Sequence, residues 1–74
     1  MPQRVGVIGC GRWGSKHLRA LEMLAEETDI ECIVACDVYP TALARIDNDR
    51  ILLHNDPSTL VEQFNLDSVI VATP

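Results

Sequence analysis

The segment VGVIGCGRWGSKHL, residues 5–18, restricts the fold of this chain more than any other stretch. Gly9, Gly11 and Gly14 follow a short apolar run and precede residues with helical spacing of apolar side chains. A glycine turn between a strand and a helix allows a sharp change of direction and leaves the helix N-terminal amides accessible. The segment therefore predicts a strand–turn–helix unit that can bind an anion at the turn.

Apolar and amphipathic segments alternate along the rest of the chain. Runs rich in β-branched residues predict parallel strands at residues 4–8, 31–37, 51–53 and 69–72, the third being the weakest. Helices are predicted at residues 12–27, 41–46 and 58–64. Pro40 and Pro57 suit the starts of the two short helices, and Asp56 suits an N-cap.

The order β-α-β-α-β-α-β predicts an α/β fold. We expect a three-layer, Rossmann-like doubly wound parallel sheet, first half only, with strand order 3-2-1-4. In such a sheet the strand at residues 69–72 would have an open apolar edge, which predicts self-association.

Length and charge limit the class of protein. A chain of 74 residues forms one small domain, and a net charge of -5 argues against a nucleic-acid partner. The charge is uneven, because residues 1–21 carry +4 and residues 22–74 carry -9. Apolar runs are only a few residues long and no signal-peptide pattern is present, so we expect no membrane partner and a cytoplasmic location.

The cysteines and histidines match no metal pattern. Cys10, Cys32 and Cys36 are odd in number and form no C-x-x-C pair, so we interpret them as small buried residues. Adding His17 and His54 produces no zinc-site spacing, and we predict no metal.

Each glycine of the turn has a mechanical interpretation. Gly9 allows the sharp turn, Gly11 lets a pyrophosphate approach the backbone, and Gly14 lets the helix pack on the sheet. Arg12 and Lys16 stand near a helix N-terminus, where cations are locally unfavourable, yet we assign anion binding to the amides and their positive field. The phosphate loop of nucleotide triphosphatases is disfavoured, because Ser15 precedes Lys16 in the inverted order.

Asp37 ends the second predicted strand, 23 residues after Gly14. A dinucleotide-binding fold places an acid near this point, where it binds the adenosine ribose hydroxyls. A carboxylate there repels a 2'-phosphate, and neither Val38 nor Tyr39 is the arginine that NADP favours. Asp37 thus predicts NAD over NADP, unless it is an ordinary turn residue at a strand end.

The segments VGVIGCGRWGSKHL, ACDVYP and DSVIVATP together resemble the N-terminal part of the Gfo/Idh/MocA oxidoreductase family. The resemblance implies that residues 1–74 form the N-terminal portion of an NAD-binding Rossmann domain. It also implies hydride transfer between nicotinamide and a sugar, polyol or related hydroxy or carbonyl substrate. The implied cofactor-binding residues are Gly9, Gly11, Arg12, Trp13, Gly14, Asp37, Ala72, Thr73 and Pro74.

The family's Glu-Lys-Pro catalytic motif has no match in this sequence, so no catalytic residue is assigned, and the remaining strands and the substrate domain are expected outside this chain. An alternative function is a non-catalytic sensor or assembly module that binds NAD or another adenosine ligand, such as S-adenosylmethionine. For His17 we favour packing or capping over catalysis. Trp13 either packs or covers the cofactor, and His54 is interpreted as a surface or turn residue.

Overall fold

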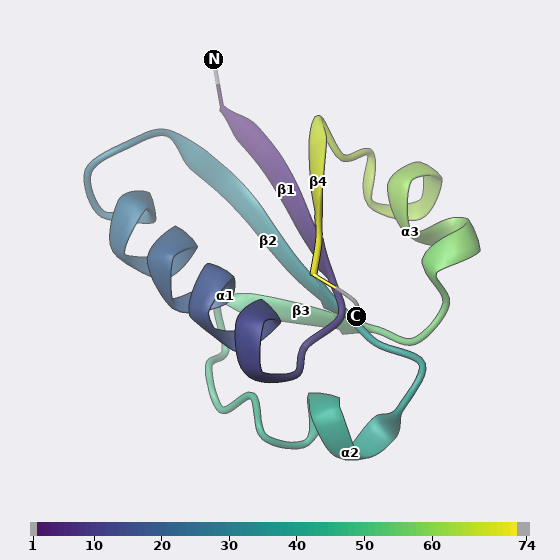
Figure 1. Ribbon diagram of the computed structural model, residues 1–74. Helices are drawn as coiled ribbons and strands as arrows, with labels where there is room; N and C mark the ends of the chain where they lie inside the picture. The colour runs from purple at the N-terminus through teal and green to yellow at the C-terminus, as the bar shows by residue number, and fades with distance from the viewer. Residues whose placement is uncertain (1, 73–74) are drawn as a thin grey trace.

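The computed structural model describes residues 2–72, with the side chains of residues 12 and 13 excepted. Four strands and three helices alternate along the chain (Figure 1). They are β1 (Gln3–Ile8), α1 (Arg12–Ala25), β2 (Ile30–Cys36), α2 (Pro40–Leu43), β3 (Ile51–His54), α3 (Pro57–Phe64) and β4 (Ser68–Val71).

All four strands are parallel and lie in the order β3-β2-β1-β4. Val5 of β1 is level with Ile33 of β2 on one side and with Ser68 of β4 on the other. The carboxyl ends of the strands therefore meet at one edge of the sheet (Figure 1). The predicted fold class and strand order are confirmed.

The helices cover both faces of the sheet, which gives three layers (Figure 1). Alternate residues of β2 face opposite sides, as the twofold period of a strand requires. On the face covered by α1, the buried core is Val5, Val7, Cys10, Leu18, Leu21, Ile33, Ala35 and Ile51. On the face covered by α3, it is Cys32, Val34, Cys36 and Leu60.

The two outer strands are only partly covered. Val71 of β4 is 67% exposed, and Leu52 and Leu53 of β3 are 45% and 47% exposed. Only the central strands β1 and β2 are therefore covered on both faces, although the apolar runs predict this for every strand. Within residues 2–72, β4 is an outer strand that pairs with β1.

Most element boundaries agree with the predictions within two residues, and α2 differs most. This helix is one turn, Pro40–Leu43, where the sequence predicts a helix to residue 46. None of its four residues is buried. Ala42 and Leu43 are partly buried against the core on the α1 face, and Ile46 packs there beyond the end of the helix.

Candidate functional site

Backbone hydrogen bonds join the carboxyl ends of the strands. The amide of Gly9 donates to the carbonyl of Cys36 at 2.8 Å, which ties the turn after β1 to the end of β2. The amide of Ala72 donates to the carbonyl of Ile8 at 2.8 Å, which ties the end of β4 to β1. Residues far apart in sequence thus form one site at this edge, where the strand order reverses and ligands of such folds bind.

The turn from β1 into α1 requires glycine at two positions. Gly9 has a φ angle of 91°, a conformation that residues with a side chain rarely adopt. At Gly14 a Cβ atom would overlap the carbonyl oxygen of Gly9 and lie 2.6 Å from its carbonyl carbon. Gly14 is therefore required because α1 lies directly against the turn, as predicted from the sequence.

Gly11 is different, because a Cβ atom built there meets no atom of the described residues within 4 Å. Its φ angle of -76° is outside the left-handed region that favours glycine. Gly11 is the N-cap of α1, and within the described part of the chain no side chain caps this helix. The first turn of α1 also contains no acidic residue. Within the described part of the chain, no carboxylate from the first turn of α1 therefore compensates the positive end of this helix.

Asp37 lies immediately after β2 and faces the turn. Its Oδ2 accepts a hydrogen bond from the Cys10 amide at 2.9 Å, and its Oδ1 accepts one from the Tyr39 amide at 2.9 Å. The side chain is half-buried, whereas Val38 and Tyr39 are 58% and 69% exposed. The structure thus places a carboxylate beside the glycine turn.

Cys10, in the middle of the turn, has hydrogen bonds both to the end of β2 and to α1. Its Sγ donates to the carbonyl of Cys36 at 3.5 Å, and its own carbonyl accepts from Ser15 Oγ at 3.2 Å. Burial raises the pKa of the Cys10 thiol to about 11, and the negative charge of Asp37 contributes to this rise. Burial likewise raises the pKa of Cys36. All three cysteines are free and buried, which confirms the interpretation as small buried residues.

The structure brings together most of the residues that the sequence singles out. Gly9, Gly11, Gly14, Asp37 and Ala72 lie at the same edge of the sheet. The backbone of Arg12 and Trp13 forms the start of α1. Thr73 and Pro74 are outside the described residues. The contact of Asp37 with the Cys10 amide is new, and only the pairing of β1 with β2 could have indicated it.

Arg4 lies near the start of β1, at the end of the strand away from the glycine turn. There its Nε donates to the carbonyl of Phe64 at 2.8 Å, and its Nη1 lies 3.4 Å from Glu31. His17 is exposed, which contradicts the packing part of its predicted role, packing or capping, but not the capping part.

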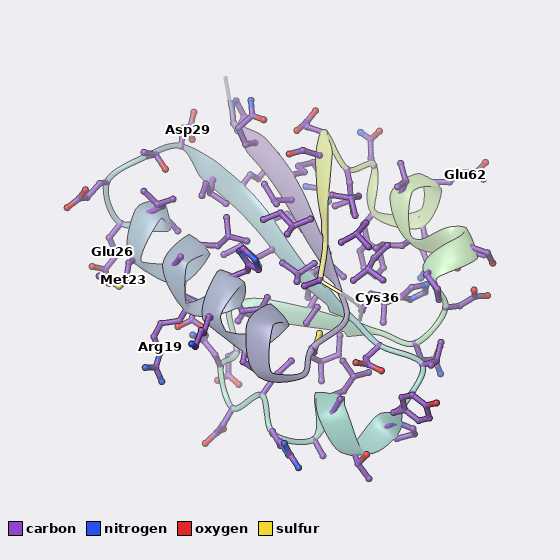
Figure 2. All side chains as sticks on the ribbon, viewed as in Figure 1. Arg19, Met23, Glu26, Asp29, Cys36 and Glu62 are labelled. Carbon is purple, nitrogen blue, oxygen red and sulfur yellow. The ribbon has the colours of Figure 1, made fainter. Side chains whose placement is uncertain are left out.

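His54, interpreted from the sequence as a surface or turn residue, is partly buried and has two side-chain contacts. It is the last residue of β3, its Nε2 lies 2.8 Å from Thr59 Oγ1, and its ring meets Phe64 edge-on. Figure 2 shows Cys36 where the strands converge, whereas Glu26, Asp29 and Glu62 lie at the periphery, away from this point. The labelled acids thus add no carboxylate to the site.

Residues 2–72 contain neither a metal-binding cluster nor a membrane-spanning helix. No group of three or more histidine, cysteine or acidic side chains in this range could hold a metal ion. No helix in it is long and apolar enough to cross a membrane.

Several known proteins have a region that is similar in sequence to nearly all of this chain. An inositol 2-dehydrogenase from Saccharopolyspora erythraea is 30% identical over 99% of this chain, and one from Paenarthrobacter aurescens is 34% identical over 99%. The rhizopine catabolism protein MocA from Rhizobium meliloti is 28% identical over 96%. The chain spans 21–22% of the length of these relatives. No solved structure matches at comparable significance.

A family model agrees with these relatives. The model described as "Oxidoreductase family, NAD-binding Rossmann fold" matches residues 3–74, from the first strand to the last residue. The match includes the glycine turn, Asp37 and the end of β4. The chain therefore belongs to the Gfo/Idh/MocA family of oxidoreductases and carries the NAD-binding Rossmann fold of that family.

Proposed function

We propose that the turn between β1 and α1 binds the pyrophosphate of NAD(H). The observation that carries this proposal is the open N-terminus of α1. A Cβ atom placed on Gly11 would have no neighbour within 4 Å, and no side chain in the described part of the chain caps the helix. The amides at such a helix start and the helix dipole attract a phosphate. The backbone of Arg12, Trp13 and Gly14 would hold the anion.

Asp37 is the residue that we assign to the adenosine ribose. Its carboxylate lies beside the turn and is only half-buried, so oxygen lone pairs remain available for the ribose hydroxyls. The negative charge disfavours a 2'-phosphate, and the exposed Val38 and Tyr39 supply no compensating cation. The site is therefore proposed to prefer NAD to NADP.

The end of β4 is assigned to the nicotinamide half of the cofactor. Ala72 is tied to Ile8 at the end of β1, and β1 and β4 are the neighbours between which the strand order reverses. The following Thr73 and Pro74 belong to this assignment by their place in the sequence. Bound NAD supplies the hydride acceptor, while this chain binds and orients it.

For the whole protein we propose oxidation of a polyol or sugar-like hydroxyl group. The printed names of the relatives, inositol 2-dehydrogenase and a rhizopine catabolism protein, support this substrate class. Mixing the protein with NAD and a panel of inositols and sugars, and following NADH absorbance, tests it. Oxidation of an inositol is expected, and inactivity towards every polyol and sugar would reject this substrate class.

Direct binding tests the cofactor assignment independently of catalysis. Calorimetric titration with NADH, NADPH and S-adenosylmethionine is expected to rank NADH first. Asp37→Ala should weaken NADH binding by about tenfold to a hundredfold, from a charge-assisted hydrogen bond of about 1.5–3 kcal/mol. Preferred binding of S-adenosylmethionine would instead favour the sensor function, and an unchanged NADH affinity in the variant would remove the role of Asp37.

A further inference from the structure

We propose that Asp37 is also a positioning residue, which holds the glycine turn in its binding conformation before any cofactor arrives. Its effect on the cofactor rests on the proposed NAD function, but its effect on the turn does not. The proposal concerns one contact, the 2.9 Å hydrogen bond from the Cys10 amide to Asp37 Oδ2.

Cys10 is the residue through which the turn is fixed. Its amide is held by Asp37, its carbonyl by Ser15 Oγ at 3.2 Å, and its thiol by the carbonyl of Cys36 at 3.5 Å. The residues on either side are both glycines, Gly9 with a φ angle of 91° and Gly11, whose carbonyl accepts from the Ser15 amide at 2.9 Å. Glycines lose more conformational freedom on ordering than other residues. A turn with glycine on both sides of Cys10 therefore needs such anchors to keep its amides aligned.

The two oxygens of Asp37 have different partners. Oδ1 accepts from the Tyr39 amide, which closes a local turn after β2, while Oδ2 reaches across to the turn after β1. Each oxygen keeps a second lone pair for a ribose hydroxyl. One carboxylate can thus join the two strand ends and bind the sugar at the same time.

The charge of Asp37 provides a way to distinguish its role in holding the turn from its role in binding the ribose. A carboxylate near a pyrophosphate site repels the phosphates, so removing the charge alone should strengthen the binding of a ligand that lacks ribose hydroxyls. Losing the anchor should do the opposite, because the amides of the turn are no longer held in place. The two roles predict effects of opposite sign on such a ligand.

Asp37→Asn is the variant that tests the anchor. The single oxygen of asparagine can accept from the Tyr39 amide or from the Cys10 amide. The NH2 group of asparagine only donates, so one of these two hydrogen bonds is lost. Asp56→Asn is the matched control, since Asp56 also accepts from a backbone amide two residues ahead, that of Ser58, but caps α3 instead of the turn. Asparagine is an equally good N-cap, so the control should fold normally.

The first measurement needs no ligand. With cysteine labelled by ¹⁵N, the amides of Cys10, Cys32 and Cys36 can be followed by hydrogen exchange in both variants. Asp37→Asn is expected to speed exchange at Cys10 by about tenfold, the factor for one hydrogen bond, while Cys32 in the centre of β2 is unchanged. Asp56→Asn should leave Cys10 unchanged. Unaltered Cys10 exchange in Asp37→Asn would overturn the proposal.

The second measurement uses NAD whose adenosine ribose lacks the 2' and 3' hydroxyls. Asp37→Asn should weaken this analogue by about threefold to tenfold if the anchor matters for binding. Equal or tighter binding of the analogue would contradict an anchor effect on binding larger than the effect of the lost charge. If the unaltered protein binds no NAD, the proposed function fails, and Cys10 exchange still decides whether Asp37 holds the turn.

Discussion

Helices α1 and α3 both begin after the carboxyl ends of parallel strands, yet their N-termini are capped differently. α3 is capped by its own chain, because Asp56 accepts hydrogen bonds from the amide of Ser58 at 3.0 Å and from its hydroxyl at 2.6 Å. α1 begins at Gly11, which has no side chain, and no acid lies in its first turn. The N-terminal amides of one helix thus receive a carboxylate from their own N-cap, and those of the other do not.

The difference agrees with the proposed pyrophosphate site at the start of α1. An N-cap carboxylate satisfies amides that otherwise lack a partner and complements the positive end of the helix. Leaving α1 without one costs stability but keeps the amides available for a phosphate.

The largest effect is expected where α1 meets the turn. Gly14→Ala places a Cβ on the Gly9 carbonyl, so α1 must move away from the sheet. We expect a loss of about 3 kcal/mol or more in the free energy of unfolding, the upper range for overpacking. Urea unfolding followed by circular dichroism measures it. Gly11→Ala is the control, with an expected cost of about 1 kcal/mol or less, since its site is open. Equal costs in the two variants would contradict the packing role of Gly14.

The next effect comes from giving α1 the kind of cap that α3 has. Gly11→Asp adds a carboxylate that can accept from the first amides of α1, so stability should stay level or rise. NADH affinity should fall by more than about tenfold, because that carboxylate competes with and repels the phosphates. Gly11→Ala separates the steric part of the loss from the charge. Unchanged NADH affinity in Gly11→Asp would place the pyrophosphate elsewhere.

The reverse change removes the cap of α3. Asp56→Ala should lower Tm by less than Gly14→Ala does, because it exposes amides that water can reach. It should leave NADH affinity unchanged, since α3 has no part in the proposed site. A scanning calorimetry trace and an NADH titration of the same sample check both statements. A weaker NADH affinity would show that the two helix ends are coupled.

The smallest effect is the acid dependence of that cap. Hydrogen bonds from the side chain and then the amide of Ser58 hold the pKa of Asp56 below its ordinary value of 3.8. A lowered folded-state pKa contributes stability above the ordinary value, and this contribution is lost as the pH falls through the lowered pKa. The stability difference between the wild type and Asp56→Ala should therefore shrink below pH 3.8. A difference that stays constant with pH would mean that the charge of Asp56 is not involved.

Local features of the site were predictable, and contacts across the sheet were not. The roles of Gly9 and Gly14 and the Asp56 cap depend on neighbouring residues, so spacing alone indicates them. The bond between Asp37 and the Cys10 amide depends on the register of β1 with β2, which no local pattern contains. The bond from Arg4 Nε to the Phe64 carbonyl joins residues 60 positions apart, so no local pattern indicates it either.

The measurement that tests the central claim most directly is an NADH titration of protein labelled with ¹⁵N at glycine, serine and threonine. The four glycines include Gly6 in the middle of β1, where Leu60 and Leu66 cover it, as an internal reference. We predict that the amide signals of Gly9, Gly11 and Gly14 move with NADH, while those of Gly6 and of Ser58 in α3 stay in place. Movement at the start of α3, or no movement at the three turn glycines, would contradict the account.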